Sequence, residues 1–322
     1  LGQRRYTELD VQIPSTREFK ILQIADVQIA NMKDDCKDLT AAQRHWPCSG
    51  KNSTSFIQRP IHQDRPNIVV FTGDNVYGTE SDQRSQQLLK KITASVVAAS
   101  IPFALVTGNH DVEQPWMSIS AMHEFMRRDR AHQGGGALLS GNGLIRFRSR
   151  DNKTRIDLWL LEYMHRFCIL CYNGAGHGAY HAVTSEQVDM FRHQPTSNVV
   201  SLAFSHVPIP EYHDVVKRRG DFMEPISDGG YSALYKTMLQ KNVTVLSVGH
   251  DHINNFCGRL QRGPYLCYGG GSGYTTYGVP GWPRRARVFT VVGEKVQTYV
   301  RLDDENFSKI HEQRFDLQAG RA

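Results

Sequence analysis

The segment NIVVFTGDNVYG, residues 67–78, joins an apolar run to a polar loop. Ile68–Phe71 is continuously apolar and rich in β-branched residues, as expected of a strand that is covered on both faces. Asp74 follows where this run ends. In α/β proteins the loops beyond the ends of the strands present the functional side chains. The segment therefore predicts a buried strand that delivers Asp74 to a site at the edge of a sheet.

Four other segments have the same form, an apolar run that gives way to small or polar residues: ADVQ (25–28), GNHD (108–111), FSHVP (204–208) and GHDH (249–252). A two-metal centre needs oxygen and nitrogen ligands that converge from several strand ends. With Asp74, these segments supply six candidate ligands: Asp26, Asp74, Asn109, His206, His250 and His252.

The order of apolar runs predicts the fold class. Up to about residue 110 the chain alternates strand, helix and strand, which favours βαβ units with parallel pairing. The later part is richer in hairpins. We expect a helix broken near Pro60, a second helix capped by Thr79, and a helix that begins with a Thr184–Gln187 capping box. No linker or internal repeat is evident, so residues 1–322 are expected to form one domain.

The motifs in this order resemble those of the calcineurin-like metallophosphoesterases. The broad family has a histidine where this chain has Gln28, which is a poor metal ligand. Purple acid phosphatases lack that histidine and use a tyrosine in Gly-Asp-x-x-Tyr, a pattern that Tyr77 fits. The resemblance covers about residues 19–304. GYTTYGVPGWPRRARV (273–288) and RLDDENFS (301–308) also resemble the small single-domain plant and fungal type.

The resemblance implies a fold and a set of ligands. The fold is a four-layer α/β/β/α sandwich of two mixed sheets flanked by helices. Asp74 would bridge two metals, an Fe(III) and a divalent Zn, Fe or Mn ion, since a tyrosinate is a hard anionic donor. The implied ligands are Asp26, Asp74, Tyr77 and His252 for the first metal, and Asp74, Asn109, His206 and His250 for the second.

The implied activity is hydrolysis of phosphate monoesters at acid pH, with a metal-bound hydroxide as the nucleophile. His110 would contact the phosphoryl group or protonate the leaving oxygen, and Asp111 would orient His110. A phosphodiesterase or nucleotide hydrolase on the same centre is the first alternative. A binding protein that kept the fold and lost activity is the second.

The composition limits partners and location. A formal net charge of +6 suits an anionic substrate, here a small phosphorylated molecule, and equally a solvated surface. No nucleic-acid-binding motif and no apolar run of membrane-spanning length is present; the oligomeric state is left open.

The cysteines and sequons favour a secreted or vacuolar/lysosomal protein whose leader has been removed. Cys36–Cys48 and Cys257–Cys267 are plausible disulfides, whereas a bridge between Cys168 and Cys171 is doubtful. N-glycosylation is possible at four positions: Asn52, Asn152, Asn242 and Asn306.

Overall fold

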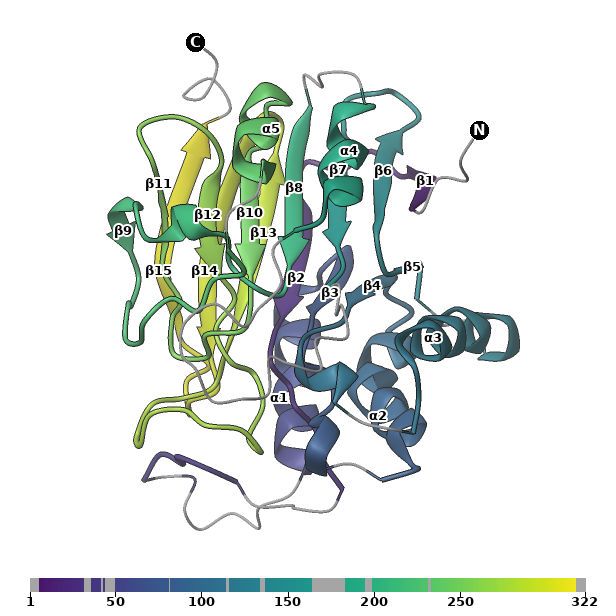
Figure 1. The fold of residues 1–322 in the computed structure, drawn as a ribbon, viewed down its shortest axis with the longest axis vertical. Helices are drawn as coiled ribbons and strands as arrows, with labels where there is room; N and C mark the ends of the chain where they lie inside the picture. Colours follow the sequence, from purple (N-terminus) through teal and green to yellow (C-terminus); the bar gives the residue numbers. More distant parts are fainter. Residues whose placement is uncertain are drawn as a thin grey trace.

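Two β-sheets pack face to face in this computed structural model, which describes residues 6–31, 36–41, 43, 50–80, 82–113, 116–133, 137–163, 183–194, 199–230 and 233–316. Five helices lie on their outer faces within these ranges (Figure 1). The result is the expected four-layer α/β/β/α sandwich.

One sheet has seven strands in the order β15-β14-β13-β2-β3-β4-β5. The predicted early strands β2, β3 and β4 pair in parallel, and β13 and β14 form an antiparallel hairpin beside them. The bounds are β2 Phe19–Ile24, β3 Ile68–Thr72, β4 Phe103–Val106, β5 Leu139–Ser140, β13 Arg285–Val292, β14 Lys295–Leu302 and β15 Lys309–Asp316.

The other sheet has eight strands in the order β1-β6-β7-β8-β10-β12-β11-β9. Its centre, β7-β8-β10-β12, is parallel, while β6 pairs antiparallel with β7 and β11 pairs antiparallel with β12. The bounds are β1 Thr7–Ile13, β6 Gly143–Ser149, β7 Arg155–Leu161, β8 Val200–Ser205, β9 Val216–Arg219, β10 Val245–Val248, β11 Cys257–Arg259 and β12 Tyr265–Tyr268. Both sheets are therefore mixed, and β1 and β15 lie outside the expected core of residues 19–304.

Alternate side chains of each strand enter different layers, because successive residues point to opposite faces. On β3, Ile68 and Val70 pack between the sheets, whereas Val69 and Phe71 pack under helices. The helices over the seven-stranded sheet are α1 Gly50–Asp64, α2 Ser85–Ala98 and α3 Ile119–Gln133; those over the eight-stranded sheet are α4 Ser185–Arg192 and α5 Leu234–Gln240. A strand buried on both faces explains the continuous apolar runs.

Two expected helix boundaries were wrong and one was confirmed. Helix α1 continues through Pro60, since Phe56, Ile57 and Pro60 are buried on the face that packs against the sheet. This packing offsets the roughly 3 kcal/mol that an interior proline costs. Thr79 does not cap α2; it lies in a 3₁₀ turn, and α2 begins at Ser85. The Thr184–Gln187 capping box is formed at the start of α4.

Cys257 and Cys267 form the expected disulfide between β11 and β12. Cys36 is also disulfide-bonded. Cys48, Cys168 and Cys171 lie outside the described residues. Within those residues, the helices are too short or too polar to cross a membrane.

Candidate metal centre

The five motifs meet at one edge of the sandwich, beyond the carboxyl ends of β2, β3, β4, β8 and β10. Three of the predicted ligands have left-handed backbone conformations: Asp26 (φ 54°), Asp74 (φ 49°) and His250 (φ 73°). Such conformations cost roughly 1–3 kcal/mol each in non-glycine residues and persist where the surrounding structure fixes them. The strand-to-loop turns thus aim these side chains inward.

Asp74 is packed tightly by glycines on both sides. A Cβ atom at Gly108 would lie 2.2 Å from Asp74 Oδ1 and 2.6 Å from His206 Nε2. Gly73 has φ 89°, and a Cβ there would lie 2.6 Å from His206 Nδ1. The glycines of GDN and GNHD therefore let the two loops and His206 approach one another.

Two clusters of possible metal ligands share Asp74. Asp74, His206 and His250 form one, and Asp26, Asp74 and His252 form the other; in each, the ligand atoms lie within 4.8 Å of one another and all are buried. Asp74 Oδ1 lies 3.3 Å from His206 Nε2, on the side of the first of these clusters. Its Oδ2 instead accepts a hydrogen bond from Gln28, on the side of His252. Asp74 thus faces both clusters, one oxygen toward each.

The cluster around His206 includes Asn109. His206 Nδ1 lies 3.0 Å from the carbonyl oxygen of Thr72 and donates to it, which turns Nε2 toward the site. Nε2 lies 3.0 Å from Asn109 Oδ1. Burial lowers the pKa of His206, but the charge and hydrogen bond of Asp74 outweigh this and raise it to about 9. Burial, together with charged His206, holds the pKa of His250 well below its usual range.

The cluster around His252 contains an unpartnered carboxylate oxygen. Asp26 is fully buried; its Oδ1 accepts from the His250 amide at 2.9 Å, and its Oδ2 has no hydrogen-bond partner. Burial raises the pKa of Asp26 well above its usual range, since the attraction of His206 compensates only in part. An unpartnered buried oxygen among carboxylate and imidazole donors fits a bound metal cation.

Gln28 of ADVQ and Tyr77 of GDNVYG have different surroundings. Gln28 Nε2 is 2.9 Å from Asp74 Oδ2 and 3.3 Å from His252 Nε2, inside the Asp26 cluster. Tyr77 places its ring edge-on against His110, with 5.2 Å between ring centroids. Tyr77 thus lies beside His110, whereas Gln28 lies within the Asp26 cluster.

His110 lies above the centre with 29% of its side chain exposed. Its amide donates to Asp74 Oδ1 at 2.8 Å, and its Nδ1 lies 2.7 Å from Glu113 Oε2. Burial lowers the pKa of His110, but Glu113 and Asp74 raise it overall. Glu113 was not predicted from the sequence, although its position one helical turn after His110 is a signal for such a contact.

Asp111 has a different environment from the one expected for orienting His110. Its carboxylate accepts from the amides of Asn75, Val76 and Gly108 at 2.8–3.1 Å, and from Asn75 Nδ2. Burial, with the charge of Asp74, raises its pKa to about 6. Asp111 therefore ties the loop after β3 to the loop after β4, and Glu113 is the carboxylate beside His110.

The glycine- and tyrosine-rich segment after β12 also borders the centre. Tyr277 stacks on the His252 ring with 4.0 Å between centroids, and its carbonyl lies 3.2 Å from His252 Nδ1. Tyr277 donates its hydroxyl to Glu224, whose carboxylate also accepts from the Ile253 amide. These contacts fix the His252 ring with Nε2 toward Asp26.

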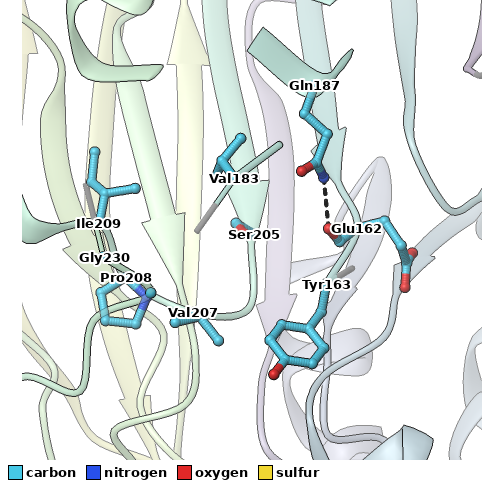
Figure 2. A pocket seen from close by; sticks show the side chains of 10 residues that line it. Glu162, Tyr163, Val183, Gln187, Ser205, Val207, Pro208, Ile209 and Gly230 are labelled. Atoms are coloured by element: carbon cyan, nitrogen blue, oxygen red, sulfur yellow. Dashed lines mark hydrogen bonds between the residues drawn. The ribbon is translucent and has the colours of Figure 1, made fainter. Parts of the chain in front are cut away.

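A small pocket is lined by residues at and after the ends of β7 and β8, by Val183 and Gln187 at the start of α4, and by Gly229 and Gly230 (Figure 2). The Tyr163 ring stands edge-on to His206, with 6.4 Å between centroids. Behind it, Gln187 donates to the Glu162 carbonyl, and the Glu162 carboxylate accepts from the Thr107 amide. Glu162, which lines the pocket, thus also holds the loop that carries Asn109.

Comparison with known proteins gives consistent results. The calcineurin-like phosphoesterase family matches residues 19–254. "Probable inactive purple acid phosphatase 28" of Arabidopsis thaliana is 32% identical over 96% of this chain and 87% of its own length. "Phosphatase DCR2" of Saccharomyces cerevisiae is 30% identical over 89% of this chain and 54% of its own length.

Among solved structures, a dimetal phosphatase from Danio rerio superposes with a TM-score of 0.62 at 16% identity, over 93% of this chain and 99% of that one. At that identity the likeness concerns the fold. The sequence matches reach further, since they span the motifs that build the metal centre. The chain belongs to the calcineurin-like phosphoesterase family, with purple acid phosphatase-like relatives in plants.

Proposed function

We propose that this protein hydrolyses phosphate monoesters at acid pH at a dinuclear centre of Fe(III) and a divalent Zn, Fe or Mn ion. The supporting observation is Asp74, which belongs to both ligand clusters and directs one oxygen toward each. Bound ions would supply positive charge and Lewis acidity to the phosphoryl oxygens. Asp26, Tyr77 and His252 complete the first ligand set; Asn109, His206 and His250 complete the second.

Residues of the chain itself would supply the proton that the leaving oxygen needs. His110 is the residue placed to donate to the leaving oxygen, because it is partly exposed above the ligands and held by Asp74. Glu113 favours the protonated imidazole by its contact with Nδ1. Asp111 keeps the loops that carry Asp74 and Asn109 at a fixed separation. We propose that the protein is secreted or vacuolar/lysosomal, consistent with its disulfide and sequons.

Two alternatives remain within the proposal. A phosphodiesterase or nucleotide hydrolase would use the same two ligand clusters. The plant relatives are named probable inactive phosphatases, which favours a binding protein, while the yeast relative is named a phosphatase.

Hydrolysis of p-nitrophenyl phosphate and of its bis ester, measured from pH 4 to 8 with metal content determined on the same samples, tests the proposal. We expect faster turnover of the monoester, with an optimum below pH 7. Asp74→Asn should abolish turnover and lower the metal content of both sites, because one carboxylate serves both. Two bound metals without turnover of either ester would support the binding-protein alternative instead.

A further inference from the structure

The Gln28 side chain is held within the ligand cluster of Asp26. It is 1% exposed, and its backbone adopts φ 41°. The backbone N–H of Gln28 donates to the backbone carbonyl of Asp74 at 2.8 Å, and the Thr275 hydroxyl donates to the backbone carbonyl of Gln28. The backbone is therefore fixed on both sides, so the side-chain amide reaches the cluster by construction.

The two hydrogens of this amide are directed at two metal ligands. One bond goes to Asp74 Oδ2 at 2.9 Å. The other is directed at His252 Nε2 at 3.3 Å, which accepts because Nδ1 donates to the Tyr277 carbonyl at 3.2 Å. A metal ion needs these same lone pairs. Gln28 Nε2 thus occupies the only lone pair of His252 Nε2 and one of the two lone pairs of Asp74 Oδ2.

The two contacts of the Gln28 amide go to Asp74 and His252, and the third ligand of this cluster is Asp26. Asp26 Oδ2 is buried without a hydrogen-bond partner, so the amide satisfies the cluster only in part. In the other cluster, His206 Nε2 faces Asn109 Oδ1 and Asp74 Oδ1, which are themselves predicted ligands. Within the described residues, the side chains that face His206 Nε2 are thus ligands that would stay in place around an ion.

We propose that Gln28 is a built-in competitor for the first metal, so that the two sites fill unequally. The site of Asp74, Asn109, His206 and His250 binds its ion first. An ion at Asp26, Asp74 and His252 has to displace the Gln28 amide and binds more weakly. This deepens and rests on the proposed function: the second, weaker ion would make activity depend on the free metal concentration.

Mn²⁺ titration of the metal-free protein tests this without any substrate, by calorimetry and by electron paramagnetic resonance of free Mn²⁺. We expect the wild type to bind two ions with dissociation constants at least about tenfold apart, the scale of two hydrogen bonds, one of them to a charged group. Gln28→Ala should tighten the weaker site about tenfold, since the competitor is gone. Gln28→His should tighten it further by adding a ligand. Both should leave the tighter site unchanged.

Thr275→Ala is the matched control, since it removes one of the two hydrogen bonds to the Gln28 backbone but keeps the side-chain amide; it should tighten the weaker site clearly less than Gln28→Ala does. A weaker second site in Gln28→Ala would overturn the proposal, because it would mean that Gln28 binds the metal through Oε1. Equal affinities in the wild type, or binding of fewer than two ions by every variant, would also overturn it. A chain that binds Mn²⁺ as expected but hydrolyses no ester contradicts only the proposed function.

Discussion

Replacing Asp111 with alanine should destabilise the protein strongly, although Asp111 is not among the clustered ligands. The substitution leaves the amides of Asn75, Val76 and Gly108 without an acceptor in a site that is fully buried. Each unsatisfied buried donor costs about 1–3 kcal/mol. Three of them at the low end give a loss of about 3 kcal/mol in the free energy of unfolding.

Urea unfolding of the metal-free protein at about pH 4.5 measures this loss, because the raised pKa of Asp111 keeps its carboxyl largely uncharged at that pH. The absence of metal separates loop packing from ligand loss. Asp189→Ala on α4 is the control, since the exposed side chain of Asp189 pairs with the exposed Arg192 on the same helix. Its effect should stay below about 0.5 kcal/mol. If Asp111→Ala loses less than about 1 kcal/mol, the carboxylate does not hold the two loops together.

Three more substitutions, at His110, Tyr77 and Glu224, test the catalytic, ligand and pH-dependent roles of single side chains. His110→Ala should keep both metals and slow turnover by roughly 10²–10⁴-fold, less for aryl than for alkyl phosphates, because aryl leaving groups need little protonation; equal losses measured for both would argue against proton donation. Tyr77→Phe should abolish a violet phenolate-to-iron absorption and weaken the first metal, so unchanged visible spectra would exclude Tyr77 as a ligand. Burial raises the pKa of Glu224 to about 7 from its ordinary 4.5 despite its hydrogen bonds, so its charged form is disfavoured in the folded protein. The stability of the wild type should therefore fall, relative to that of Glu224→Gln, as the pH rises from about 4.5 to 7. Urea midpoints of the two proteins that stay parallel across that range would contradict this.

The sequence by itself determined the sandwich and most of the centre. Strands such as Ile68–Thr72 are buried on both faces, so they appear as continuous apolar runs, and the polar residues that follow them meet at one edge of a parallel sheet. Asp26, Asp74, His206, His250 and His252 were predicted in this way and do converge. The Cys257–Cys267 pair was predictable because the two residues flank a short hairpin.

The tertiary structure alone decided how the polar side chains are paired. Asp111 follows His110 in sequence, yet it faces the amides of the neighbouring loop, because a 3₁₀ turn at His110–Val112 directs the two side chains apart. The helix through Pro60 depends on burial against a sheet that lies elsewhere in the sequence. Gln28 was interpreted as the loss of a ligand, whereas its side-chain amide contacts Asp74 and His252, which lie 46 and 224 positions away in the sequence. Hydrogen bonds of this range depend on angles and distances that only the packed loops fix, which is why the pattern of residue types does not determine them.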